Sequence, residues 1–265
     1  MNLAIRGIGA NLGDLHANTF FDDQHINLKA DYIMANPPFN QDDWREKDEL
    51  INDQRWQGYD LPPSSNANYA WILHMVSKLS DRGIAGFILG PGATSAGSEE
   101  YKIRKKLIEN DLVEAIITLP RNIFYTTDLN VNLWILNKNK KGALSEFKEL
   151  TKDLRNREGE ILFMDLRRSG SPLEKKFIQL TSTEIKEASS IFHNWQSETN
   201  FAKYNNVPEF CYSAKLDEIK EKDFSLVPSK YIPLKKENSA LDFEKEMNSI
   251  KKMMRDILKE EIKSQ

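Results

Sequence analysis

Short apolar runs and amphipathic segments alternate along the chain, a pattern typical of a layered α/β fold. Apolar runs of strand length lie at residues 32–35, 84–89, 112–119, 131–136 and 161–165. Segments 66–79 and 99–110 have helical periodicity, and we expect Gly83 to end the first helix. That helix places five apolar residues on one face: Tyr69, Ile72, Leu73, Val76 and Leu79. A further short strand is expected around Leu15. The alternation over residues 11–136 predicts a doubly wound sheet.

Helical signals dominate the C-terminal part of the sequence. A capping box, Thr181-Ser182-Thr183-Glu184, opens a helix that runs to about Trp195, and a second short helix is expected from Ser213. Residues 239–262 carry apolar side chains at alternating four- and three-residue steps: Phe243, Met247, Ile250, Met254 and Ile257. We interpret this seam as one face of a coiled coil that a partner helix covers. The alternative is packing against its own domain.

Composition narrows the classes of function. The chain has 265 residues, of which 40% are hydrophobic, and a net charge of −3. Because DNA-binding domains usually carry a basic excess, any DNA contact is expected to be local or delegated to a partner. Cys211 is the only cysteine and the four histidines lack ligand spacing, so we expect no metal site. No apolar run approaches the length that spans a bilayer, which favours the cytoplasm over a membrane.

One short motif indicates a chemistry. The run Tyr32-Ile33-Met34-Ala35 leads directly into Asn36-Pro37-Pro38-Phe39, and the two prolines end the strand and stiffen its exit. The Asn36 oxygen and the Pro37 carbonyl can each accept one hydrogen of an exocyclic amine, while Phe39 stacks on the ring that carries it. Such contacts free the nitrogen lone pair to attack a methyl donor. The alternative is a rigid turn without a catalytic role.

Asn36-Pro37-Pro38-Phe39 resembles the catalytic motif of the S-adenosylmethionine-dependent methyltransferases that modify adenine in DNA. Further segments resemble one branch in particular, the modification (M) subunits of type I restriction-modification systems. These segments are residues 1–8, 30–40, 68–71, 83–89, 119–120, 123–127 and 160–165. The resemblance covers nearly the whole chain.

The resemblance implies the C-terminal part of such a subunit. Members of that family carry, upstream of the matching region, a helical N-terminal domain and a glycine-rich turn that cradles the cofactor, and neither is recognisable here. The implied fold is a partial doubly wound, Rossmann-like methyltransferase sheet followed by C-terminal helices. We therefore divide the chain into a methyltransferase portion (1–166), a helical or irregular extension (167–238) and a partner-binding helix (239–265).

The resemblance also implies specific contacts. Asn18, Thr19, Asn36, Asn68 and Tyr69 are the expected contacts to S-adenosylmethionine; an Asx turn is an equally good interpretation of Asn18. Phe124 and Tyr125 are expected to include one aromatic that stacks on the extruded adenine, with the other in the core. The implied partners are DNA, a specificity subunit that reads the recognised sequence, and a restriction subunit.

Three surface segments leave alternatives open. Residues 41–66, with Trp44 and Trp56, are either a loop that closes over a flipped base or an ordered surface loop whose tryptophans pack on the body. The cationic side chains of helix 99–110 form either a phosphate-facing patch or a solvated face; they are Lys102, Arg104, Lys105 and Lys106. Residues 137–159 are expected to be a solvated connection with a short helix.

Three functions fit these patterns. The first is methyl transfer to the amine of a flipped adenine in DNA. The second is a catalytically inert fragment that binds only its specificity-subunit partner. The third is methylation of a protein amide, which the long helical extension disfavours.

Overall fold

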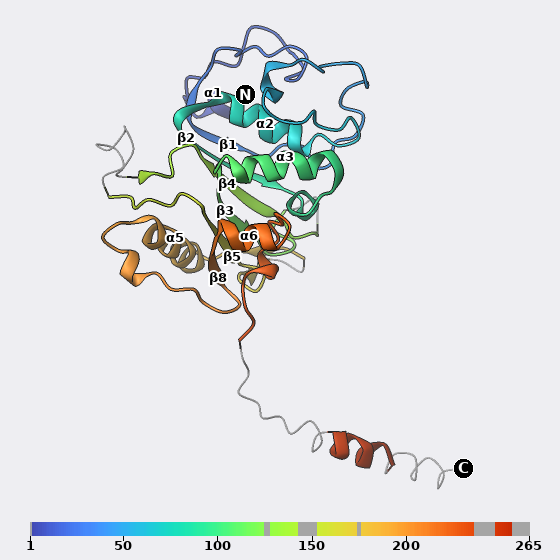
Figure 1. Ribbon diagram of the computed structural model, residues 1–265, viewed down its shortest axis with the longest axis vertical. Helices are drawn as coiled ribbons and strands as arrows, with labels where there is room; N and C mark the ends of the chain where they lie inside the picture. Colours follow the sequence, from blue (N-terminus) through green and yellow to red (C-terminus); the bar gives the residue numbers. More distant parts are fainter. Residues whose placement is uncertain (1, 125–127, 143–152, 174–175, 236–246, 256–265) are drawn as a thin grey trace. The chain divides into compact units, whose positions relative to one another are not determined.

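The computed structural model describes residues 2–124, 128–142, 153–173, 176–235 and 247–255 (Figure 1). Two compact units, residues 1–233 and 234–265, are considered separately. The helices of the first unit are α1 (Asn2–Ile5), α2 (Asn68–Lys78), α3 (Ser98–Glu109), α5 (Ser182–Gln196) and α6 (Leu216–Glu221). Its strands are β1 (Ala30–Ala35), β2 (Leu79–Leu89), β3 (Val113–Thr118), β4 (Asn132–Asn137), β5 (Glu160–Asp165), β6 (Ser171–Pro172), β7 (Ile178–Gln179) and β8 (Cys211–Lys215). The described part of the chain also has short 3₁₀ turns at Gln54–Trp56, Pro91–Thr94, Phe201–Lys203 and Pro228–Lys230.

Six of the described strands form one mixed sheet in the order β1-β2-β4-β3-β5-β8. β1 is parallel to β2, and β3 is parallel to β5, whereas β4 runs antiparallel to both of its neighbours. Strands β1, β2, β3 and β5 therefore end at one edge, which we call the carboxyl edge: Asn36, Gly90, Leu119 and Leu166 follow them there. The opposite, amino edge holds the start of these strands and the end of β4. The α/β class predicted from the sequence is confirmed.

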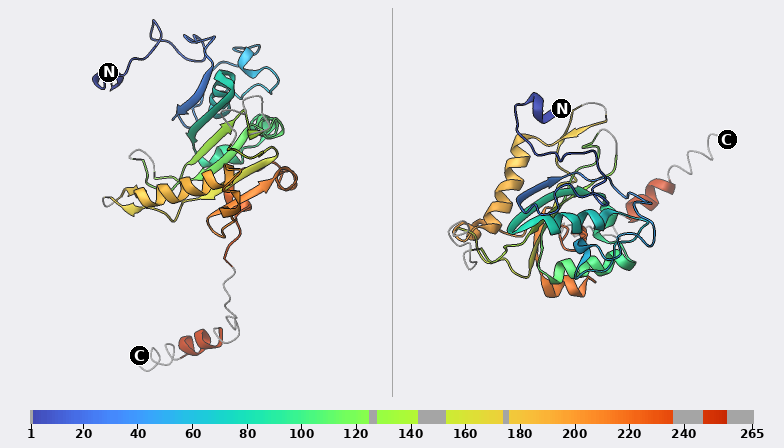
Figure 2. Two further views of the ribbon diagram at one scale, coloured as in Figure 1. Left: turned by 90° about the vertical axis from the view of Figure 1, so that its left-hand side faces the viewer. Right: turned by 90° about the horizontal axis from the view of Figure 1, so that it is seen from above.

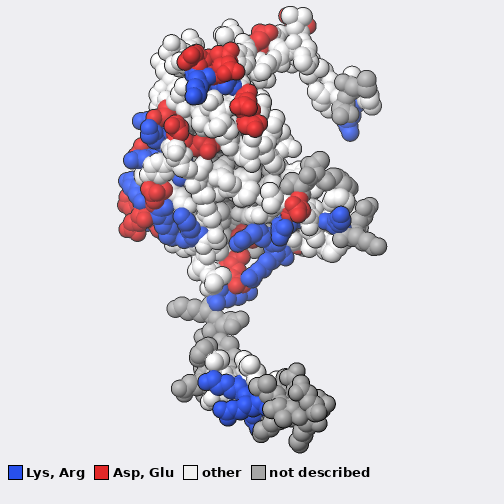
Figure 3. Space-filling model, turned by 90° about the vertical axis from the view of Figure 1, so that its right-hand side faces the viewer, with Lys and Arg blue, Asp and Glu red and all other residues white. Residues whose placement is uncertain are grey.

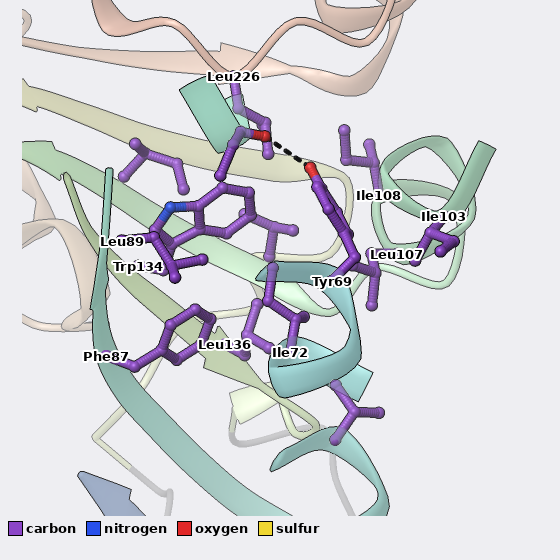
Figure 4. Close-up of a cluster of buried hydrophobic side chains, with 14 of the residues drawn as sticks. Tyr69, Ile72, Phe87, Leu89, Ile103, Leu107, Ile108, Trp134, Leu136 and Leu226 are labelled. Carbon is purple, nitrogen blue, oxygen red and sulfur yellow. Dashed lines mark hydrogen bonds between the residues drawn. The ribbon is translucent and has the colours of Figure 1, made fainter. Parts of the chain in front are cut away.

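Three helices cover one face of this sheet. Apolar side chains of α2, α3 and α6 pack on the strands in a single buried cluster, drawn in part in Figure 4. In it, the rings of Phe87 and Trp134 stack with centroids 6.0 Å apart. The predicted apolar face of α2 points into this cluster, since Tyr69, Ile72 and Leu73 are fully buried.

The other face is covered only in part by the described residues. Helix α5 packs there on β3, β5 and β8 through Ile191, Phe192 and Trp195 (Figure 2). At the far end of the sheet, β1 pairs only with β2 among the described strands, and Tyr32 and Met34 are 80% and 93% exposed. Helices of the described residues therefore cover both faces of the sheet at the β5–β8 end, but only one face at β1.

Local signals placed two boundaries wrongly. Helix α2 ends at Lys78, and Gly83 lies inside the longer strand β2, where β1 and β2 shift register. A Cβ at Gly83 would stand 2.8 Å from the Ala30 carbonyl oxygen, so glycine is needed for the close approach of the strands. Ser213 lies in β8, paired with β5, and the next helix begins at Leu216.

A third local prediction was also wrong. Leu15 is in no strand among the described residues and is 72% exposed. By contrast, the capping box of α5 is confirmed, because the Thr181 hydroxyl accepts from the Glu184 backbone N–H and the Glu184 carboxylate accepts from that of Thr181.

The predicted solvated connection 137–159 is wrong for its described part. Lys140, Arg155 and Arg157 are all buried at the amino edge. Arg157 Nε donates to Glu114 at 2.8 Å with both side chains fully buried, and Lys140 Nζ lies 2.5 Å from Asp111. The charged residues of this segment therefore belong to the interior of the fold.

Of the second unit, residues 234–235 and 247–255 are described, and residues 247–255 are helical as predicted. Within it, the seam residues Met247, Ile250 and Met254 are 36%, 51% and 59% exposed. The remainder of the predicted helix 239–262 lies outside the described residues. No helix among the described residues has the length and apolar character needed to cross a membrane.

Candidate active site

The Asn36–Phe39 motif lies at the carboxyl edge, immediately after β1. Pro37 is buried and Phe39 packs half-buried against the core cluster, so the backbone of the turn is held by the body. Asn36 is exposed, and its side chain makes no hydrogen bond to any described residue. The motif thus presents a free amide on a fixed backbone.

Asn40 and Asn68 fix the exit of this turn. The Asn68 Oδ1 atom accepts from the Asn40 backbone N–H at 3.0 Å, and its Nδ2 donates to the Asn40 Oδ1 at 2.8 Å. Asn40 has a φ of 50°, a left-handed conformation that asparagine tolerates better than most residues. Sequence analysis did not single out Asn40. Its signal is an asparagine directly after a motif that must turn sharply.

Phe20, Trp44 and Trp71 form an aromatic cluster in the part of the core against which Phe39 packs. Phe20 lies 4.3 Å from Trp71 and 4.6 Å from Trp44 between ring centroids. Trp44 and Trp56 are only 4% and 3% exposed, and their indole N–H groups donate to the carbonyls of Pro63 and Leu50. Of the two interpretations of residues 41–66, the ordered surface loop is therefore confirmed.

Arg55 ties this loop to the segment before β1. Its guanidinium donates to the carbonyls of Thr19 and Phe20 and to the Asp53 carboxylate. His74 of α2 lies beside it, with Nδ1 3.3 Å from Arg55 Nη1. Burial, and next the charge of Arg55, lower the pKa of His74 to about 4, so this histidine is neutral near pH 7.

The residues predicted to contact the cofactor are not gathered around Asn36. Asn18 forms an Asx turn, its Oδ1 accepting from the Phe20 N–H at 2.9 Å, while Thr19 lines a separate hollow of about 450 Å³ with His16 and His74. Among the described residues, the Asn68 side chain forms hydrogen bonds with Asn40, the residue after the motif, and with none of the motif residues themselves. Tyr69 is fully buried and donates to the Ala93 carbonyl at 2.7 Å (Figure 4). In the described residues, both ends of the Asn68 amide and the Tyr69 hydroxyl are thus engaged within the protein.

The aromatic candidates lie between β3 and β4. Phe124 is half-buried in this connection, which leaves β3 at the carboxyl edge. Tyr125 lies outside the described residues. Phe124 therefore shares an edge with Asn36, and the stacking role of either aromatic stays a prediction.

The cationic side chains of α3 do not form one patch. Arg104 is 3% exposed and donates to the carbonyls of Phe224 and Ala96, so it belongs to the core. Lys102 and Lys105 pair with Asp60 and Glu109 at 3.6 and 3.9 Å. On the face drawn in Figure 3, Lys and Arg likewise alternate with Asp and Glu around a broad area without charge. The prediction that Arg104 belongs to a phosphate-facing patch is wrong. The lysines lie on the solvated face of the helix, which was the alternative.

No group of three or more His, Cys, Asp or Glu side chains among the described residues could hold a metal ion. Around the Asn36 turn, the described side chains are amides and aromatic rings. An exposed amide on a stiff turn at this edge of an α/β sheet is typical of a site that binds a small polar group.

Comparison with known proteins defines the class. The sequence profile of the family described as N-6 DNA Methylase matches residues 1–240. The chain is 36% identical over 258 residues to the type I restriction enzyme HindI methylase subunit of Haemophilus influenzae, covering 97% of this chain and 54% of that protein. It is 33% identical over 268 residues to the MjaIX methylase subunit of Methanocaldococcus jannaschii, covering 99% and 45%.

Solved structures show the same fold. The type I restriction-modification methyltransferase subunit from Streptococcus thermophilus superposes with a TM-score of 0.72 at 24% identity, over 88% of this chain and 45% of that one. A chain from a structure on complex assembly of the type I R-M system gives 0.58 at 15% identity, over 93% and 47%. This chain belongs to the N-6 DNA methylase family, and the resemblance to type I modification subunits is confirmed. It spans about half the length of the curated relatives it matches.

Proposed function

We propose that this chain is the catalytic half of an adenine-specific DNA methyltransferase. The observation that supports this most directly is the exposed, unbonded amide of Asn36 on the stiff turn that follows β1. In this proposal Asn36 and the Pro37 carbonyl accept the two amine hydrogens of a flipped adenine, and Phe39 contacts its ring. Phe124 or Tyr125 stacks on the other face.

Each group in the proposed site has a physical role. S-adenosylmethionine supplies, when bound, a methyl group on a positively charged sulfur. Two acceptors on the amine weaken its conjugation with the ring and aim its lone pair outward. Because the turn is already fixed by Pro37, Pro38 and the Asn40–Asn68 pair, little freedom is lost when the amine binds. The amine proton leaves to water after the transfer, so no strong base is needed.

The described residues fit only part of the cofactor. Asn18 and Thr19 stay our proposed contacts to its adenine end, and Asn68 and Tyr69 stay proposed near its site, although their polar atoms bond within the protein. We propose that the remaining contacts come from a segment that packs along β1. Among the described strands β1 pairs only with β2, so the backbone groups of its other edge can pair with a further strand. The exposed side chains of Tyr32 and Met34 can be covered by the same segment.

The same proposal covers the partners. The seam of helix 247–255 would contact the specificity subunit, a restriction subunit would join that complex, and DNA would be bound mainly through it, in the cytoplasm. The proposed division into 1–166, 167–238 and 239–265 follows from these roles. In the alternative, the chain is inert and only this helical region is functional.

Titration calorimetry with S-adenosylmethionine tests the proposal. We expect weak or no heat with the chain alone and clear binding after addition of the N-terminal half of the HindI methylase subunit, of which this chain covers 54%. The Tyr32→Asp variant should lose this gain, because a charge would be buried when a strand covers β1. Asn110→Asp, an exposed change away from β1, is the control and should keep it. If S-adenosylmethionine did not bind even with both halves present, the result would favour the inert fragment.

A further inference from the structure

A second polar hollow lies at the carboxyl edge, away from the Asn36 turn. It has a volume of about 320 Å³ and is lined from four parts of the fold: the loop after β2, the end of β3 with the start of β4, Arg167 after β5, and residues 227–229. We call it the Asn132 cavity. Its polar lining includes Ser95, Thr118, Asn130, Asn132, Arg167 and Ser229.

Asn132 is the distinctive residue of this cavity. Its side chain is held in place, because Oδ1 accepts from the Thr118 hydroxyl at 2.9 Å. Asn132 is only 2% exposed, yet its Nδ2 group donates to no described residue. An amide N–H group at a cavity wall that has no described partner can donate to the acceptor of a ligand.

Arg167 adds a second donor. Its Nε and Nη2 atoms bind the Asp165 carboxylate at 2.9 and 2.5 Å, which fixes the plane of the guanidinium. The third nitrogen, Nη1, donates to no described residue, and the side chain is 48% exposed where it lines the cavity. The hydroxyls of Ser95 and Ser229 can also donate. The cavity therefore offers amide, guanidinium and hydroxyl donors, the groups that bind phosphate oxygens.

The position of the cavity relates it to the Asn36 turn. β4 is two strands from β1 and β3 is three, which corresponds to about 10 to 14 Å at the usual strand spacing of about 4.8 Å. A DNA strand advances about 3.4 Å per nucleotide, so a few nucleotides span this distance. A strand with its target base at Asn36 can therefore reach the Asn132 cavity.

We propose that the Asn132 cavity binds a backbone phosphate of the DNA strand that carries the target adenine. This inference rests on the proposed function, because it assumes a base held at Asn36. Asn132 Nδ2 and Arg167 Nη1 would each donate to one phosphate oxygen. The contact would position the strand without reading its sequence.

The test is fluorescence anisotropy of a short, adenine-containing single-stranded DNA with the full 265-residue chain. Arg167→Gln should weaken binding at least fivefold and reduce the slope of log K against log salt by about 0.7, the value for one phosphate on a single strand. Arg82→Gln is the matched control: it removes the same charge from another Arg–Asp pair, at the amino edge, whose arginine is similarly exposed, 42% against 48%. It should leave both quantities unchanged.

Two further experiments test whether the ligand is a backbone phosphate of DNA. The same oligonucleotide with uncharged methylphosphonate linkages should bind the wild type and Arg167→Gln equally. Asn132→Ser should weaken binding of the charged strand with the salt slope unchanged, because the amide is neutral, and with an unchanged circular dichroism spectrum. Inorganic phosphate should compete only weakly. Equal losses in the two arginine variants, tight binding of the methylphosphonate strand, or no binding of DNA by the wild type would overturn the assignment. Cofactor titration of Arg167→Gln should match the wild type, so failure here is distinguishable from failure of the proposed function.

Discussion

The two edges of the sheet use similar polar residues in opposite ways. At the amino edge, the Glu114 carboxylate accepts from Arg157 Nε, Gln196 Nε2 and Asn137 Nδ2 at 2.8, 3.1 and 2.8 Å. At the carboxyl edge, Asn36 has no described partner and Asn132 has one for only one end of its amide. The Glu114 carboxylate at the amino edge is therefore committed to the fold, while the Asn36 amide and the Asn132 Nδ2 group at the carboxyl edge are available to a ligand.

The contrast has an energetic basis. A carboxylate and a guanidinium that are fully buried are tolerated only when each has good hydrogen-bond partners. The amino edge meets this condition for Glu114 with three donors. Exposed amides such as Asn36 carry no such requirement, so they can change without loss of the fold. Substitutions at the two edges should therefore separate stability from activity.

Glu114→Leu should have the largest effect on stability. Removing the carboxylate leaves Arg157 as a buried charge without its ion-pair partner, and we expect a loss of about 3 to 5 kcal/mol in the free energy of unfolding. Urea denaturation measures it. The control is Asp31→Asn, whose pair with Arg82 is exposed, so this change should have a much smaller effect. Equal effects of the two variants would contradict the account of the amino edge.

Asn68→Leu should have the next largest effect. It removes both hydrogen bonds to Asn40 and leaves the turn after Phe39 without its anchor, so we expect a loss of about 2 kcal/mol. It is the one carboxyl-edge change expected to affect both stability and cofactor-dependent activity. Asn110→Leu is the control, since its one side-chain hydrogen bond, to Tyr59, is exposed. If Asn68→Leu were as stable as this control, the Asn40–Asn68 pair would not hold the turn.

A smaller, pH-dependent effect should arise from His74. Its pKa in the folded protein is about 4, below the 6.5 of a free histidine, so the unfolded chain binds more protons between these values. The contribution of neutral His74 to the free energy of unfolding is fully present above pH 6.5. It falls as the pH drops towards 4, with a slope of at most about 1.4 kcal/mol per pH unit. Denaturation of wild type and His74→Phe at pH 7 and pH 5 measures the difference.

In His74→Phe the ring beside Trp71 is kept and the titration is removed, so the loss between pH 7 and pH 5 should shrink. His16→Gln, at an exposed site, should retain the full loss. An unchanged pH dependence in His74→Phe would show that other groups cause it.

Sequence reasoning succeeded where the signal is local. The run before Asn36, the apolar face of α2 and the capping box of α5 each depend on neighbours within a few residues, and all three are confirmed. The α/β class and the family followed from the same signals, because the motif and its flanking segments are contiguous in the chain.

Errors arose where distant segments decide the structure. Gly83 is a common kind of helix stop, but the pairing of β2 with β1 and β4 keeps it within a strand. Arg104 and Arg157 carry charges that usually indicate solvent, and their burial depends on the carbonyls of residues 96 and 224 and on Glu114. The Asn132 cavity draws on four separate segments, so no local pattern could reveal it.

The measurement that tests the central claim most directly compares Asn36→Ala with the wild type in two assays. One is urea denaturation; the other is transfer of labelled methyl from S-adenosylmethionine to adenine-containing DNA, with the N-terminal half and a specificity subunit added. We predict an unfolding free energy within about 0.5 kcal/mol of wild type, since Asn36 is exposed, and a rate at least about 100-fold lower. An unchanged rate in a stable Asn36→Ala protein would contradict the assignment of the chemistry to the carboxyl edge.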